Sequence, residues 1–178
     1  MGMGDADSAA IRMRLIEAEF TTPRRTGDSG RRARSTEPAA PVDLGILAYM
    51  QASVDEVVSH TRAAAPDAPP PPATASAVYH WMDQNTAHLD AEKRQAAEVI
   101  VYRQALEHAL AVGDESVVRR HPCPDCGCWG LFWRASARRA ACVNRHCSGE
   151  GQAAHTFTLA QLARRHVASR ESAVRRAT

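Results

Sequence analysis

The chain has 178 residues, of which 44% are hydrophobic and only 5% aromatic, so alanine supplies much of the apolar content. Because alanine buries little area per residue, this composition excludes a large, densely packed enzyme core along the whole length. No apolar run is long enough for a transmembrane helix and residues 1–10 carry no apolar signal-peptide region, so we expect a soluble, cytoplasmic protein without membrane contact.

Charge is distributed unevenly, although the formal net charge is only +2. Residues 1–118 hold 11 Lys and Arg against 17 Asp and Glu, a charge of −6. Residues 119–178 hold 11 Arg against three acidic residues, a charge of +8. A basic third on an acidic remainder is typical of a protein with an anionic partner, or of two halves that contact each other. A solvated basic face would give the same pattern.

We expect residues 1–41 to form a flexible arm that contains a short helix. Residues 8–20 are predicted to form a marginal amphipathic helix, because one face at helical spacing holds Ile11, Leu15, Ile16 and Phe20. The rest of the arm lacks apolar periodicity and is rich in helix breakers. The N-terminus is therefore predicted to be partly disordered.

An amphipathic helix is predicted over residues 42–63, because apolar side chains recur there at steps of three and four residues. This stripe suits either the protein core or a homodimer seam. The stripe consists of Leu47, Met50, Val54, Val57 and Thr61. A proline-rich linker follows over residues 64–75, where four consecutive prolines favour a stiff polyproline II spacer and mark a boundary.

A second helical segment is predicted over residues 76–118. Asp90 is an N-cap candidate for its longest helix, and Gly113 is a stop signal. The histidines of this segment show no metal-ligand spacing, so we place them at the surface or at its boundary. They are His80, His88 and His108.

Four cysteines in the basic third have the spacing of a zinc site. Cys123 and Cys126 form a Cys-x2-Cys pair, and 15 residues separate it from a Cys-x4-Cys pair, Cys142 and Cys147. Zn²⁺ takes four such ligands at the corners of a tetrahedron. A glycine after the first pair favours a tight turn, and two short strand patterns joined by Ala-Ser-Ala predict a hairpin that brings the pairs together. The sequence therefore predicts a zinc ribbon over residues 119–158.

Other side chains beside the motif leave the ligand set open. His146 precedes Cys147 and offers a Cys-x3-His alternative, whereas Cys128 would strain the first turn as a ligand and is placed beside the site. His121 lies before the first ligand and suits a role in orienting it. A site closed by four thiolates has no position for a reactive water, and the chain has no phosphate loop, nucleophile elbow or HExxH motif. We therefore do not expect an enzyme.

The cysteine motifs also carry a resemblance to known proteins. The pair CPDCG and CVNRHC is similar to zinc ribbons of topoisomerase tails, transcription factors and many phage proteins. The longer run from Tyr102 to Arg134, with HTFTLAQLARRH after it, resembles a group of uncharacterised proteins from actinobacteria and their phages or prophages. The resemblance covers roughly the last 100 residues. It implies a helical segment followed by a ribbon and brings no activity that can be transferred.

Aromatic rings and arginines lie together in the ribbon and in the helix after it. Bases stack on exposed tryptophan while arginines pair with phosphates, so this pattern favours single-stranded nucleic acid. The candidate nucleic-acid-binding residues are Trp133, Arg134, Arg138, Arg139, Arg145 and Arg164. Regular alternation would place Trp129 on the face of Trp133, and Trp129 and Phe132 also suit the core of a small domain. A basic C-terminal helix is predicted over residues 159–178, with a helix-turn-helix as the alternative.

The fold class predicted from these elements is mainly α with a small zinc-ribbon hairpin or three-stranded element, an α+β protein with Zn²⁺ as cofactor. The leading hypothesis is an accessory protein that binds nucleic acid or acts at a nucleic-acid machine through its basic third. One alternative is a protein-interaction adaptor with a purely structural zinc site, including a homodimer through the helix at residues 42–63. Another is a thiol redox sensor that uses Cys128.

Overall fold

The computed structural model describes residues 5–21, 44–147 and 154–177. The elements are α1 (Asp5–Thr21), α2 (Leu44–Ala64), α3 (Ala77–Thr86), α4 (Ala91–Ala111), α5 (Ser116–Arg119), β1 (Leu131–Arg134), the 3-10 turn η1 (Ala135–Ala137), β2 (Arg139–Cys142), β3 (Thr156–Phe157) and α6 (Leu159–Ala177). This part of the chain is mainly helical with a small three-stranded antiparallel sheet, which confirms the predicted α+β class. Most of the arm predicted to be disordered lies outside the described residues. No helix in the described ranges has the length and hydropathy needed to cross a membrane.

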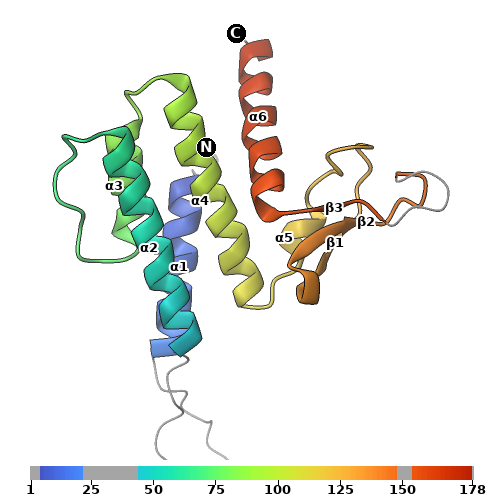
Figure 1. Cartoon of the computed structure of the whole chain (residues 1–178), viewed down its shortest axis with the longest axis horizontal. Coiled ribbons are helices and arrows are strands. Elements are labelled where there is room, and N and C mark those ends of the chain that lie inside the picture. The colour runs from blue at the N-terminus through green and yellow to red at the C-terminus, as the bar shows by residue number, and fades with distance from the viewer. Residues whose placement is uncertain (1–4, 22–43, 148–153, 178) are drawn as a thin grey trace, which may run out of the picture.

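Figure 1 shows a helical bundle and a small sheet that meet at one helix. α1, α2 and α3 lie beside α4, while the sheet lies beyond the end of α4 and α6 runs back alongside it. Two clusters of buried side chains follow this arrangement. Val101 and Ala105 of α4 belong to the cluster inside the bundle, whereas Leu106 and Ala109 belong to the cluster shared with the sheet and α6. α4 therefore joins the two cores.

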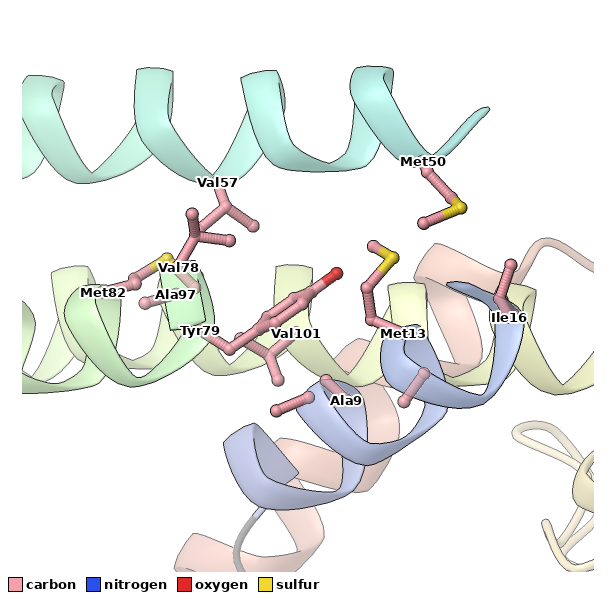
Figure 2. Close-up of a cluster of buried hydrophobic side chains, with 12 residues drawn as sticks. Ala9, Met13, Ile16, Met50, Val57, Val78, Tyr79, Met82, Ala97 and Val101 are labelled. Atoms are coloured by element: carbon pink, nitrogen blue, oxygen red, sulfur yellow. The ribbon is translucent and has the colours of Figure 1, made fainter. Parts of the chain in front are cut away.

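α1 packs on α3 and α4 through a face that differs from the predicted one. Ala9, Met13 and Ile16 point into the bundle core in Figure 2 and are fully buried. Ile11 and Leu15 are 41% and 59% exposed, so the prediction that they share the buried face with Ile16 was wrong. Alanine permits close approach between helices and methionine fills irregular gaps, which suits the buried face of α1.

The predicted stripe of α2 faces the core of its own chain. Met50, Val57 and Thr61 are buried, whereas Leu47 at the start of the stripe is 37% exposed. The stripe is therefore buried within the bundle. The homodimer through this helix stays a prediction, and it would have to use the other faces of α2.

The proline-rich segment connects two helices of one bundle. Val57 of α2 and Val78 of α3 lie in the same buried cluster, although we expected a boundary between them. The indole Nε1 of Trp81 donates to the carbonyl of Pro69 at 3.1 Å, which fastens the segment to α3. The segment thus links two helices that pack together and is itself held against one of them.

Polar residues on α4 are buried against α2 and find partners there and on α3. Gln104 is fully buried, accepts a hydrogen bond from the Tyr79 hydroxyl at 2.8 Å and donates to Glu56 at 2.8 Å. Arg103 pairs with Glu56 and, at 2.6 Å, with Glu107. Because an unpaired polar group in this position would cost stability, these pairs fix the register of α4 against α2.

His108 of α4 is completely buried, so its placement at the surface was wrong. The Tyr49 and Tyr79 rings lie edge-on to the imidazole, with centroids 5.6 Å and 6.3 Å away. Neither ring nitrogen has a hydrogen-bond partner among the described residues. Burial, followed by the positive charges of Arg12 and Arg103, lowers the pKa of His108 to about 4. The imidazole is therefore neutral near pH 7, and apolar periodicity missed it because α4 is covered on more than one side.

The sheet has the order β1-β2-β3 and turns one face toward the helices. The residues on this face are Leu131, Trp133, Ala140, Cys142 and Phe157. They belong to the same cluster as Leu106 of α4 and Leu162 of α6. The predicted Ala-Ser-Ala hairpin connection is confirmed as η1, and Arg138 after it has a φ of +49°, the left-handed conformation that closes the hairpin.

We predict that stability depends on pH through His108. Its pKa lies near 6.5 in the unfolded chain and is lowered to about 4 by folding, so the unfolded chain binds the extra proton between these values. This group alone should lower the free energy of unfolding by about 3 kcal/mol between pH 7 and pH 4. Urea unfolding of His108→Leu should show a correspondingly smaller fall, whereas His88→Leu, at an exposed position, should follow the wild type. Identical pH profiles for His108→Leu and the wild type would contradict the prediction.

Candidate metal centre and basic ribbon surface

The first cysteine pair lies on a tight turn shortly after α5. The Gly127 amide donates to the Cys123 carbonyl at 2.9 Å, and the Cys123 amide donates to the Cys128 carbonyl at 2.9 Å. Gly127 has a φ of +72°, a left-handed conformation that disfavours a side chain. The turn predicted from this glycine is confirmed, and it directs the sulfurs of Cys123 and Cys126 to one place.

The second pair lies on a turn at the end of β2 that is ordered by Asn144. The Asn144 amide donates to the Cys142 sulfur at 3.4 Å. The Asn144 Oδ1 accepts from the His146 amide at 3.0 Å, and the Asn144 carbonyl accepts from the Cys147 amide at 3.0 Å. The loop between Cys142 and Cys147 is therefore folded back so that both sulfurs reach the first pair.

The four sulfurs come together as their spacing predicted. Cys123 Sγ lies 3.7 Å from Cys147 Sγ, and Cys126 Sγ lies 3.8 Å from Cys142 Sγ. All four sulfurs lie within 4.8 Å of one another. A tetrahedron with Zn–S bonds of ~2.3 Å has edges of ~3.8 Å, whereas a disulfide needs ~2.0 Å. The group is not paired in disulfides and could hold a metal ion.

Charge within the group also fits a cation. The Cys128 amide hydrogen-bonds the Cys126 sulfur and lowers the pKa of Cys126 to about 6. Burial raises the pKa of Cys142, and burial together with the neighbouring thiols raises that of Cys147. Without a cation, ionisation of one thiol therefore disfavours ionisation of its neighbours. A bound metal ion deprotonates all of its thiol ligands. Four soft sulfur donors in a tetrahedral arrangement suit Zn²⁺.

The alternative ligands considered from the sequence lie outside this group. Cys128 is exposed, and its sulfur accepts from the Asn144 side chain at 3.6 Å. His146 is exposed and belongs to no donor group among the described residues. His121 lies 3.2 Å from the Tyr102 hydroxyl and edge-on to the His166 ring rather than against a cysteine. No hydrogen bond between the His121 ring and a cysteine is found among the described residues, so its role in orienting a ligand stays a prediction.

Two polar residues that the sequence did not single out lie beside the group. His155 Nδ1 is 2.5 Å from Asp125 Oδ2 and 3.8 Å from Cys147 Sγ. Asp125 stands between the first two cysteines in the sequence, and His155 directly precedes β3. The spacing of His155 matches no common ligand pattern, so only the pairing of β3 with β2 brings it to the site.

The predicted nucleic-acid-binding arginines are exposed on the ribbon and on α6. They are Arg134, Arg138, Arg139, Arg145 and Arg164. Across the described ranges, none of them forms an ion pair with a carboxylate. Arg134 of β1 and Arg139 of β2 stand directly opposite each other in the register. Like charges in this position repel, so the pair favours an anion beside it.

The two tryptophans of the ribbon lie in different surroundings, although regular alternation would place them on one face. Trp133 is half-buried and packs against the core, whereas Trp129 is 67% exposed. Gly130 between the two segments has a φ of +125°, which breaks the alternation of a regular strand. Phe132 and Val143 are also exposed. The exposed apolar surface of the ribbon therefore consists of Trp129, Phe132 and Val143. The alternative that places Trp129 and Phe132 in the core of a small domain did not predict this exposure.

A cleft of about 440 Å³ separates the bundle from the ribbon. Tyr49 and Glu107 line it from the bundle side, and Trp133 and Arg138 line it from the ribbon side. Two of the predicted nucleic-acid-binding residues therefore lie at the junction of the two cores and not on the open face of the sheet.

We predict that Gly130→Ala destabilises the ribbon. An added Cβ would lie 2.6 Å from Val143 Cγ2 and would sit on a residue with φ of +125°. Strain of this kind costs about 1–3 kcal/mol. Urea unfolding should show that loss, and a smaller loss for Gly113→Ala, where φ is +84° but no atom lies within 4 Å of the added Cβ. Equal effects of the two substitutions would mean that the contact with Val143 is irrelevant.

Comparison of the chain with models of protein families, with curated proteins and with solved structures found no match. The resemblance to actinobacterial and phage zinc-ribbon proteins therefore stays a prediction. The four converging thiols, and the exposed arginines that have no carboxylate partner among the described residues, remain as the observations from which a function can be inferred.

Proposed function

We propose that the protein is a zinc-ribbon protein in which Zn²⁺ holds the ribbon together and the ribbon binds single-stranded nucleic acid. The observation that carries the proposal is the set of exposed arginines on the ribbon and α6 that have no carboxylate partner in the described ranges. The metal supplies rigidity and the arginines supply affinity for phosphate.

Zinc in this site would be structural. Cys123, Cys126, Cys142 and Cys147 would fill all four positions, so no water would be bound and activated. Cys123 and Cys142 are 2% and 4% exposed, which also keeps solvent from this side of the ion. With four thiolates and one Zn²⁺, the charge of residues 119–178 falls from +8 to roughly +6. The basic surplus therefore survives metal binding.

Single strands fit the ribbon better than duplexes because aromatic rings accompany the arginines. Trp129 and Phe132 are exposed, and bases of any sequence stack on such rings. Arg134 and Arg139 lie side by side on neighbouring strands, where one phosphate relieves the repulsion of both. The acidic remainder of the chain repels the same polymer, so binding is confined to the basic third.

The metal part of the proposal predicts one Zn²⁺ per purified chain. Cys142→Ser should lose the ion, whereas Cys128→Ser should retain it, because only Cys142 belongs to the four-cysteine group. Removal of zinc by a chelator should unfold the ribbon and preserve most helical circular dichroism, because the core of the bundle contains no ligand. Elemental analysis and hydrogen exchange provide the measurements. Zinc-free protein with a protected ribbon would overturn this part.

The nucleic-acid part predicts binding that weakens steeply with salt. In Arg134→Gln/Arg139→Gln, affinity for a mixed single-stranded oligonucleotide should fall about 10-fold at low salt, and the slope of log K against log salt should become shallower by about 1.4. The matched control is Arg62→Gln/Arg94→Gln, which removes two exposed arginines from the bundle and should bind as the wild type does. Fluorescence anisotropy at several ionic strengths measures both quantities.

Trp129→Ala separates stacking from general charge attraction in the same assay. Stacking contributes about 1–3 kcal/mol per base, so the variant should lose that much affinity for single strands and little for duplex DNA. If the variant binds single strands and duplex DNA as the wild type does, Trp129 has no stacking role.

Absence of nucleic-acid binding by the wild type at low salt would overturn the proposal. Self-association independent of salt would then favour the adaptor alternative, for which Ile11 and Leu15 offer exposed apolar surface.

A further inference from the structure

We propose that His155 is a fifth donor of the metal site, which becomes the fourth ligand when Cys147 is lost. The inference rests on the proposed metal binding by the four cysteines. His155 Nδ1 lies 3.8 Å from Cys147 Sγ, the same separation that joins the sulfurs across the site. Asp125, Cys147 and His155 have donor atoms within 4.8 Å of one another, so Cys147 belongs to two donor groups at once.

The backbone holds His155 in this position from both sides of the site. The Cys142 amide donates to the His155 carbonyl at 3.0 Å, which fixes the main chain of His155 beside one ligand. The His155 side chain contacts Asp125, which stands between Cys123 and Cys126 on the first turn. His155 is therefore tied to both cysteine turns and needs only a side-chain movement to approach the metal position.

Cys147 is the ligand that His155 can replace. Cys123 and Cys142 are almost fully buried, whereas Cys147 and His155 lie on the more open side of the site. Imidazole nitrogen is as ordinary a zinc ligand as thiolate, and three cysteines with one histidine form a regular structural set. Loss of Cys147 by alkylation or oxidation would thus leave a complete set of four donors.

The geometry fits ligation and not nucleophilic catalysis. In a cysteine–histidine–aspartate catalytic set the two partners contact different ring nitrogens, so that a proton can pass through the ring. Asp125 and Cys147 both face Nδ1 of His155. Ligation exchanges the Nδ1 hydrogen bond to Asp125 for a bond from the Nδ1 lone pair to the metal, with the ring proton on Nε2. No oxidant or further reactant is needed for this exchange.

His146, the alternative that the sequence offered, provides a matched comparison. It lies directly before Cys147, but its side chain is exposed and joins no donor group in the described ranges. Nearness in the chain favours His146, whereas the strand pairing of β2 with β3 favours His155. The two histidines can therefore be distinguished by substitution of each in the same background.

The experiment removes one ligand at a time and measures Co²⁺ binding by the full chain. Cys147→Ala and Cys142→Ala each leave three thiolates, but only Cys147→Ala vacates the ligand position that lies 3.8 Å from His155 Nδ1. We expect Cys147→Ala to bind Co²⁺ at least about 10-fold more tightly than Cys142→Ala, with a tetrahedral visible spectrum that has weaker thiolate-to-cobalt absorption than the wild type. Adding His155→Ala to Cys147→Ala should remove the advantage, and adding His146→Ala should preserve it.

The outcomes separate this inference from the proposed function. If Cys147→Ala binds no more tightly than Cys142→Ala, or if its advantage survives His155→Ala, the reserve-ligand role is overturned while zinc binding by the wild type stands. If the advantage disappears with His146→Ala instead, His146 is the reserve ligand and the inference is wrong. A wild-type chain that binds neither Co²⁺ nor Zn²⁺ would overturn both proposals.

Discussion

α4 is covered by other elements on several sides, so its polar side chains must be satisfied within the protein. Val101 faces the bundle core and Leu106, little more than one turn later, faces the core of the ribbon. A helix covered in this way cannot leave its polar groups to solvent, so Gln104 and Arg103 must find partners on α2 and α3. These pairs fix α4, and the fixed end of α4 in turn provides the surface on which the sheet and α6 pack.

The ribbon is too small to be stable through its own strands. β3 has two residues, and the inward face of the sheet shares its buried cluster with Leu106 of α4 and Leu162 of α6. Small domains of this kind need a metal or a neighbouring surface to complete their core. Here the helices cover the near face of the sheet, and the four-cysteine group that could hold a metal ion lies at the other ends of the strands. A metal ion in this group and the packing of the helices would therefore stabilise different parts of the same sheet.

Features set by neighbouring residues could be predicted from the sequence, and features set by packing could not. The cysteine group followed from two tight turns, each determined by a few local residues such as Gly127. Three features depend on which helix or strand lies opposite: the buried face of α1, the burial of His108 and the exposure of Trp129. The periodicity of apolar residues does not predict them, because it assumes that each element has one buried face. His155 required knowledge of the β2–β3 pairing, which places two distant segments beside each other.

The carboxylates that the structure describes in the basic third contact residues other than the arginines of the hairpin. Within residues 119–147 and 154–177, the carboxylates are Asp125 and Glu171. Asp125 is engaged with His155 beside the four-cysteine group, and Glu171 of α6 contacts Gln95 and Arg175. Neither carboxylate forms an ion pair with an arginine of the hairpin, although Glu107 of α4 lines the same cleft as Arg138. Because Arg134 and Arg139 are held opposite each other, a negative charge beside them would relieve their repulsion.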